Sequence, residues 1–104
     1  MNDIDYIANN ISELAVLMAL AEEASELSKA AMKLARAKGL LDNPTPVSVE
    51  QAEAGLIEEY NDLLICVDVL NKMPSLTICE DMDLRMRKCC RWAERIKRQK
   101  DTKE

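Results

Sequence analysis

The sequence predicts an all-α fold, a helical bundle of about three main helices per chain that oligomerisation completes. Residues that favour helices dominate its 104 positions, which include only 2 Gly and 3 Pro. Apolar residues repeat at helical spacing in long stripes, and these stripes are wider than one small chain can cover. Because the length fits one domain, we expect residues 1–104 to form a single domain.

The first helix is expected to run from Asp3 towards Lys38, with apolar stripes on two of its sides. Asn9 and Asn10 mark a candidate break in it, because Asn is a poor helix former and a good cap. Gly39 is expected to end the helix, since glycine readily adopts the left-handed conformation that follows a helix C-terminus.

A loop and a second helix follow. Residues 40–47 are expected to be irregular because the two prolines in this segment forbid a regular helix. Ser48 and Gln51 then have the spacing of a capping box, in which each side chain satisfies a backbone N–H of the first helical turn. The sequence therefore predicts a second helix that begins after Ser48 and that Pro74 ends.

A third helix is predicted from a second capping box, Thr77 with Glu80, to about Arg98. The residues beyond it, 99–104, are expected to be frayed. One apolar stripe follows this helix at spacings of four and three, and Trp92 is interpreted as an amphipathic anchor at a packing or dimer surface. The stripe consists of Ile78, Met82, Met86, Cys89, Ala93 and Ile96.

Charge is distributed unevenly along the chain. The net charge is −5, yet residues 84–104 hold nine basic and three acidic residues, which leaves residues 1–83 at −11. A basic end suggests either a tail for nucleic acid or cations that bind phosphate beside a carboxylate site. The chain has only one Trp and two Tyr, so it offers few aromatic side chains on which bases could stack. Nucleic acid is therefore not the expected partner.

The four cysteines, Cys66, Cys79, Cys89 and Cys90, have no metal-binding spacing, and the chain has no His. A zinc site is therefore not expected, and the cysteines are interpreted as free, mostly buried thiols of a reducing compartment. The acidic N-terminus is not that of a signal peptide, and the apolar runs are too short to cross a membrane. We expect a cytoplasmic protein without a membrane partner.

Two pairs of carboxylates, Glu23 with Glu26 and Glu59 with Asp62, stand out because each pair has i, i+3 spacing on an otherwise apolar helix. Such residues share one helix face, with Cβ atoms ~5–6 Å apart. Exposed carboxylates are the ordinary alternative, but unpaired buried charge is normally neutralised or bound to a metal, and two such helices packed together outline a metal site. Without His, the ligands are all oxygen, which favours Mg²⁺, or Mn²⁺, over iron.

The order Glu22-Glu23-x-x-Glu26 and then Glu59-x-x-Asp62 resembles the EExxE…ExxD signature of the MazG-like all-α nucleoside triphosphate pyrophosphohydrolases. That superfamily also contains the dimeric dUTPases and phosphoribosyl-ATP pyrophosphatase. The resemblance extends over most of the chain. The stretch between the two motifs is longer than is usual in the family, which suggests an enlarged connection.

The resemblance implies a metal-dependent hydrolase that cleaves a (d)NTP to (d)NMP and pyrophosphate, as a homodimer or homotetramer. Glu23, Glu26, Glu59 and Asp62 would hold Mg²⁺ (or Mn²⁺) and serve catalysis, with Glu23 or Glu26 accepting a proton from the attacking water. In the family, the loop that corresponds to residues 40–47 lies near the substrate, so the resemblance implies a lid or specificity loop. The alternative is a plain connector.

Candidate substrate-binding residues lie one to three turns beyond the carboxylate pairs and on the basic third helix. Each has an ordinary alternative as part of a solvated face or a helix end. They are Lys29, Lys33, Asn71, Lys72, Lys88, Arg91 and Arg95. The alternative to an enzyme is a non-enzymatic helical oligomeric interaction protein with a basic C-terminal helix.

Overall fold

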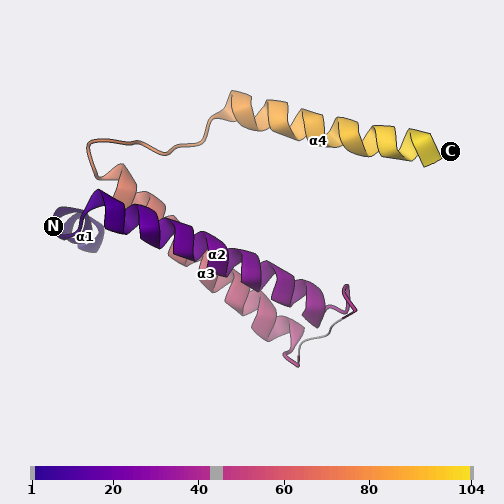
Figure 1. Ribbon diagram of the computed structural model, residues 1–104, viewed down its shortest axis with the longest axis horizontal. Helices are drawn as coiled ribbons and strands as arrows, with labels where there is room; N and C mark the ends of the chain where they lie inside the picture. The colour runs from indigo at the N-terminus through magenta and orange to yellow at the C-terminus, as the bar shows by residue number, and fades with distance from the viewer. Residues whose placement is uncertain (1, 43–45, 104) are drawn as a thin grey trace.

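A computed structural model describes residues 2–42 and 46–103 of the chain. Its elements are the helices α1 (Asp3–Asn10), α2 (Glu13–Ala37), α3 (Val49–Asn71) and α4 (Met82–Lys103). The described residues contain no strand, so the predicted all-α class is confirmed. Figure 1 shows α2 and α3 side by side and antiparallel, with α1 across one end of the pair and α4 apart from it.

The chain breaks between α1 and α2, at the candidate position predicted from the two asparagines. Asn10 donates its side-chain N–H to the Tyr6 carbonyl at 2.7 Å, which ends α1, and the Ser12 hydroxyl accepts from the Ala15 N–H at 3.1 Å, which begins α2. The two helices are bent by 118° relative to one another. The expected first helix is therefore two helices.

The end of α2 and the start of α3 follow the predicted capping rules. Gly39 has φ 73, and the N–H groups of Gly39 and Leu40 donate to the carbonyls of Arg36 and Ala35. These two bonds form a Schellman ending. Ser48 begins α3 with both bonds of the predicted capping box in place. Residues 40–42, 46 and 47 are irregular, as predicted, whereas residues 43–45 lie outside the described part.

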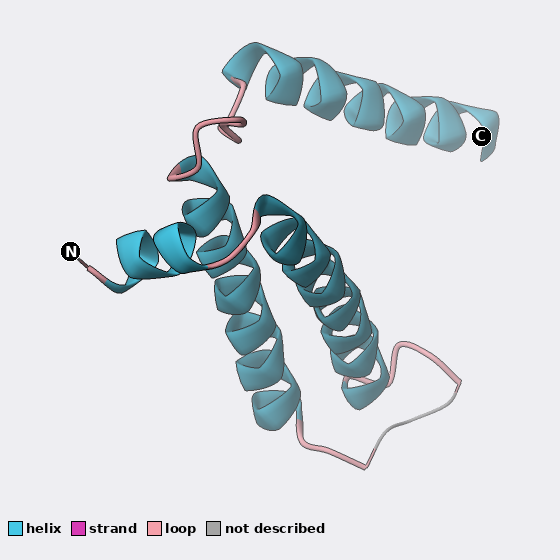
Figure 2. Cartoon of the chain, turned by 60° about the vertical axis from the view of Figure 1, so that its left-hand side comes forward, coloured by secondary structure: helices cyan, strands magenta, loops and turns pink. Residues whose placement is uncertain are grey.

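The core lies where α1 folds over the start of α2 and the end of α3, as Figure 2 shows from a second side. Val16, Val69 and Leu70 are buried there, and Ile4 and Ile7 of α1 pack against them. Among the described residues, the only other buried side chain is Ala52. A core this small leaves most of the α2–α3 pair dependent on other surfaces for burial.

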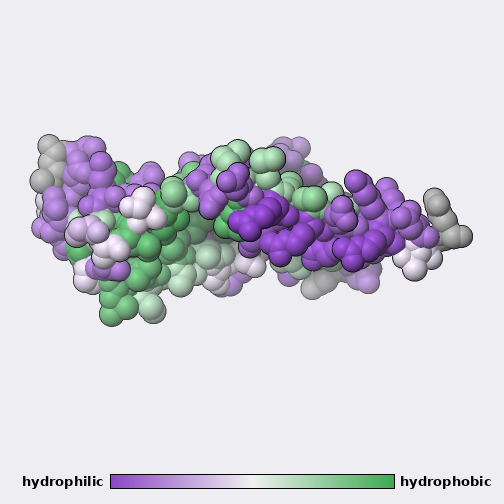
Figure 3. Space-filling view, turned by 90° about the horizontal axis from the view of Figure 1, so that it is seen from above, coloured by the Kyte–Doolittle hydropathy of each residue, from purple (hydrophilic) through white to green (hydrophobic). Residues whose placement is uncertain are grey.

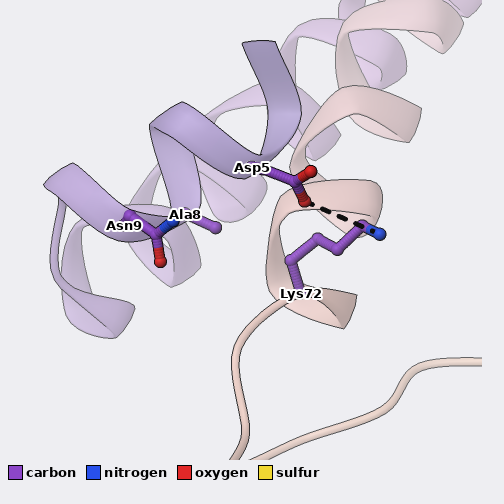
Figure 4. A pocket seen from close by; sticks show the side chains of 4 residues that line it. All are labelled: Asp5, Ala8, Asn9 and Lys72. Atoms are coloured by element: carbon purple, nitrogen blue, oxygen red, sulfur yellow. Dashed lines mark ion pairs between the residues drawn. The ribbon is translucent and has the colours of Figure 1, made fainter. Parts of the chain in front are cut away.

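Polar contacts tie the same end together. Lys72, at the C-terminus of α3, pairs with Asp5 of α1 at 3.6 Å between Nζ and Oδ1 (Figure 4). The Ser75 hydroxyl donates to the carboxylate of Glu13, the first residue of α2. Both contacts are exposed, so each adds less than about 1 kcal/mol to the free energy of unfolding. Their main effect is to hold these segments in place.

The second predicted capping box is wrong, because residues 76–81 are not helical. The Asn71 side chain clamps this segment: it accepts from the Ile78 N–H at 2.6 Å and donates to the Ile78 carbonyl at 2.8 Å. Asp81 caps α4 instead, by accepting from the Leu84 N–H at 3.0 Å. The long-range clamp on Ile78 keeps the chain extended past Thr77, which local spacing does not reveal.

The predicted fraying after Arg98 is also wrong for residues 99–103, which continue α4. The Thr102 hydroxyl donates to the Arg98 carbonyl one turn earlier. Gln, Lys and Arg are good helix formers, so local propensity extends the helix through these residues. Glu104 lies outside the described part of the chain.

Helix α4 packs against none of α1, α2 and α3, and every described side chain on it is exposed. The radius of gyration is 18.2 Å, whereas a compact chain of this length has about 13 Å. The accessible surface is 8334 Å², against about 5,900 Å² expected for a compact 11.7 kDa protein. The single chain is therefore an open structure.

The cysteines are more exposed than expected. All four cysteines are free, as predicted, but only Cys66 is half-buried; Cys79, Cys89 and Cys90 are exposed, so the expectation of mostly buried thiols is wrong. Three of them lie on the unpacked α4 or on the segment that leads to it.

Within residues 2–42 and 46–103, no single helix combines the length and apolarity needed to cross a membrane.

Candidate metal centre

Three of the four predicted ligands meet where α2 and α3 pack together. Glu23 of α2 faces one turn of α3 that carries Glu59 and Asp62, and one carboxylate oxygen from each residue lies within 4.8 Å of the other two. All three side chains are half-buried. The i, i+3 spacing of Glu59 and Asp62 places both on the side of α3 that meets Glu23.

The carboxylates of this trio repel one another. Partial burial raises the pKa of Glu59, and the negative charges of Asp62, Glu23, Glu26 and Glu58 raise it further. Its carboxylate is thus destabilised by its neighbours, as expected where several acids share one point. A bound cation would reverse the sign of that local potential.

The donor set fits a hard divalent cation. Oxygen ligands at 2.0–2.1 Å around one Mg²⁺ lie at most about 4.2 Å from one another, so oxygens within 4.8 Å need only small side-chain movements. The Cys66 thiol is not among the ligand atoms that converge here, and its pKa is raised by burial and by the charges of Glu23 and Asp62. The side chains that remain available are all oxygen donors, which suit Mg²⁺ or Mn²⁺.

Glu26, the fourth predicted ligand, lies beside the trio but not within it. It borders a shallow hollow of about 190 Å³ together with Lys29, Lys33 and Glu59. The Lys29 ammonium lies 3.5 Å from the Glu26 carboxylate, and both groups are exposed. Two predicted phosphate-binding cations are therefore placed next to the acidic cluster.

The structure does not bring Asn71 and Lys72 to this cluster. They are twelve and thirteen residues beyond Glu59 on the same helix and its cap, which corresponds to roughly 18–20 Å along the axis. The Asn71 amide holds the Ile78 backbone, and Lys72 pairs with Asp5. In this arrangement both residues fasten α3 to its neighbours.

Nor does the structure bring the predicted cations of α4 to the carboxylates. Lys88, Arg91 and Arg95 line a hollow of about 390 Å³ on α4 itself, together with Arg98. Arg98 was missed by the sequence analysis, although the row 88, 91, 95, 98 has the spacing of one helix face. These four groups form an exposed basic row that lies apart from α2 and α3.

A second hollow, of about 380 Å³ and without polar lining, was not predicted from the sequence. It is lined by Leu27, Leu56, Ile57 and Tyr60. At about 100° per residue, Leu56 and Tyr60 are turned to one side of Glu59, whereas Asp62 is turned to the other. The α2–α3 pair thus has a charged flank and an apolar flank.

The comparisons with known proteins give no relative for this chain. No family model matches it, and neither does any curated protein or solved structure.

Proposed function

We propose that the chain is a metal-dependent nucleoside triphosphate pyrophosphohydrolase, which cleaves a (d)NTP to (d)NMP and pyrophosphate. We further propose that it works in the cytoplasm as a homodimer or homotetramer. The observation that carries the proposal is the trio Glu23, Glu59 and Asp62, in which two helices present three carboxylate oxygens within 4.8 Å. The resemblance of the motifs on these helices to the MazG-like signature supports it.

In this proposal Glu23, Glu59 and Asp62 hold Mg²⁺, or Mn²⁺, with Glu26 at the edge of the site. The ion supplies charge neutralisation for the phosphates and acidifies water at neutral pH. The carboxylates fix the position of the site on two rigid helices, so the geometry is set before substrate arrives.

The reaction adds water across one phosphoanhydride bond. The water oxygen bonds to the α-phosphorus, the bond from that phosphorus to the α–β bridging oxygen breaks, and pyrophosphate leaves with the bridging oxygen. Glu26, which lies beside the trio, or the non-ligating oxygen of Glu23 accepts the proton released by the water. Lys29 and Lys33 border the same hollow and contribute positive charge for the phosphate oxygens.

The test is release of pyrophosphate from a panel of NTPs and dNTPs, measured with Mg²⁺, with Mn²⁺ and with a chelator. We expect metal-dependent release that falls at least about 100-fold in Glu59→Gln, because a ligand is lost. Glu53→Gln, an exposed change on the same helix, is the matched control and keeps full activity.

Metal binding is measured separately by calorimetry with Mn²⁺. Glu23→Gln should weaken Mn²⁺ binding about 10-fold or more while circular dichroism stays that of the wild type. Absence of both pyrophosphate release and Mn²⁺ binding in the wild-type protein would contradict the proposal.

The second candidate is a non-enzymatic helical oligomeric interaction protein. The observation that favours it is α4, a basic helix that is exposed on all sides and carries its own apolar stripe. In that case Glu23→Gln and Glu59→Gln leave its binding function intact and raise its stability, because repulsion among the carboxylates is relieved.

A further inference from the structure

Helix α4 has no partner in the single chain. It spans 22 residues, packs against no other described helix and is exposed throughout its described side chains. Most helical stability in proteins comes from tertiary packing of an apolar face rather than from intrinsic propensity. A surface that covers the apolar stripe of α4 would therefore stabilise the helix.

The helix has two opposite faces. Its apolar stripe has the four-three spacing of a packing seam and consists of Met82, Met86, Cys89, Ala93 and Ile96. The basic row of Lys88, Arg91, Arg95 and Arg98 lies on the other side, about 160–240° around the axis from Met82. Figure 3 shows the hydrophilic residues as a continuous band along α4.

The apolar flank of the α2–α3 pair is the complementary surface. It consists of Leu17, Leu27, Leu56, Ile57, Tyr60 and Leu64, of which Ile57 is 63% exposed. The stripe on α4 extends over about 21 Å, and the α2–α3 pair is about 35 Å long, so the stripe fits along the flank. The side chains that line its hollow are uncharged, and Glu53 lies on the same face of α3, between Tyr60 and Ile57 around the axis, whereas the opposite flank carries the acidic cluster.

We propose that α4 is an exchanged arm, which lays its apolar stripe on the apolar flank of α2 and α3 in a second copy of the chain. Within one chain, α4 does not cover the apolar flank of α2 and α3, because the segment 76–81 holds α4 away from the other helices. Exchange of one helix between identical chains is a low-cost route to a dimer.

Surface area and charge both favour a second copy as the occupant. The chain exposes roughly 2,500 Å² more than a compact protein of its mass, so two copies carry about 5,000 Å² in excess, the size of an obligate homodimer interface. The arm is basic, with nine basic and three acidic residues over 84–104, and the body carries −11. A positive arm on a negative body is attractive in the dimer.

The arm is tested in the full chain by sedimentation equilibrium of Met86→Glu and Ile96→Glu. Glu keeps the helix propensity but places a charge in the apolar stripe, so we expect each change to weaken dimerisation about 100-fold. Leu84→Glu, on the opposite face of α4, is the matched control and keeps the wild-type dimer. Equal dimerisation of all three variants and the wild type would overturn the proposal.

A cross-linking experiment tests whether α4 contacts the other chain. Isotopically heavy and light chains are mixed and treated with a carbodiimide, which links Lys to carboxylates, and the linked peptides are identified by mass spectrometry. Heavy–light peptides that join α4 lysines to carboxylates of α2 or α3 are expected. Peptides that join α4 only to its own chain, or α4 only to α4, would overturn the exchange.

The proposal does not depend on nucleotide hydrolysis, so the two can fail separately. A dimer with heavy–light links but without pyrophosphate release keeps the arm and rejects the enzyme. Pyrophosphate release by a wild-type protein that is monomeric at micromolar concentration rejects the arm and the proposed homo-oligomer, and keeps the hydrolase activity. Binding of that monomer to vesicles of anionic lipid would assign α4 to a membrane surface instead and would equally overturn the exchange.

Discussion

At the residue scale, Glu59 lies among the carboxylates of the candidate site. Its pKa is raised above the ordinary 4.5 by partial burial and by four neighbouring carboxylates. A native carboxyl with a raised pKa holds its proton to higher pH than the unfolded chain does. The native state therefore loses stability as pH rises from the ordinary pKa through the raised pKa, and the loss is complete above it.

This linkage predicts the effect of Glu59→Gln on the metal-free protein. The variant should be more stable than the wild type at pH 7, and the difference should vanish below pH 4.5, where the wild-type carboxyl is protonated in both states. Thermal unfolding in chelator, repeated from pH 4 to pH 8, measures the difference, with Glu53→Gln as control. A constant difference across this range would contradict the assignment of repulsion to Glu59.

The cluster of candidate ligand residues was predictable from the sequence because i, i+3 spacing on a helix fixes which side chains share a face. Glu23, Glu59 and Asp62 required only the further assumption that their two helices pack together. The role of Asn71 was not predictable in this way. Its partner is the Ile78 backbone, and that bond depends on the path of the chain after α3.

At the element scale, two glycines illustrate opposite demands of the backbone. Gly39 has φ 73 and ends α2, whereas Gly55 lies inside α3 with ordinary helical geometry. A Cβ at either position would meet no atom within 4 Å, so backbone conformation alone decides the outcome.

We predict that Gly39→Ala destabilises the protein by about 1–2 kcal/mol, because alanine is strained in the left-handed region. Gly55→Ala should stabilise it by about 0.5–1 kcal/mol, because alanine loses less chain entropy in a helix interior. Urea unfolding of both variants at one protein concentration measures the pair. Changes of the same sign would show that packing in the assembly outweighs backbone conformation at one of these positions.

The boundaries of the helices followed local rules wherever the caps are local. The break near Asn10, the Schellman ending at Gly39 and the capping box at Ser48 each rest on residues within five positions of one another. The start of α4 did not follow the predicted box at Thr77. Both Thr77 and Asp81 offer a capping oxygen, and the clamp from Asn71 to Ile78 decides between them.

At the scale of the whole molecule, the separation of charge between arm and body predicts a salt-dependent association. Residues 84–104 and the body differ in sign, and 1 M NaCl shortens the screening length from about 10 Å at 0.1 M to about 3 Å. The dimer should therefore dissociate at a higher protein concentration in 1 M NaCl than in 0.1 M NaCl.

Trp92, the single tryptophan, reports on this equilibrium because it lies beside the apolar stripe and is 63% exposed in the single chain. Its emission should move to longer wavelength on dilution, and the midpoint should rise with NaCl. Met86→Glu supplies the spectrum of the separated chain. Emission that is independent of both concentration and salt would exclude an interface at this side of α4.

The sequence predicts a homo-oligomer, which stays a prediction, but it did not predict the placement of α4. Apolar stripes on more than one side of each long segment indicated a bundle larger than one chain. Which stripe stays uncovered depends on where α4 lies, and the six residues 76–81 that position it have little periodic pattern of their own. Long-range placement of a helix is a tertiary property, and local periodicity does not determine it.

The small core has a consequence for the life of the protein in a cell. With Val16, Ala52, Val69 and Leu70 as the buried side chains of its described part, a newly made chain has little to hold it folded before it meets another. In the proposed dimer, folding and assembly become one bimolecular reaction, governed by mass action. The folded fraction rises with the rate of synthesis, and chains made in small amounts are exposed to proteases for longest.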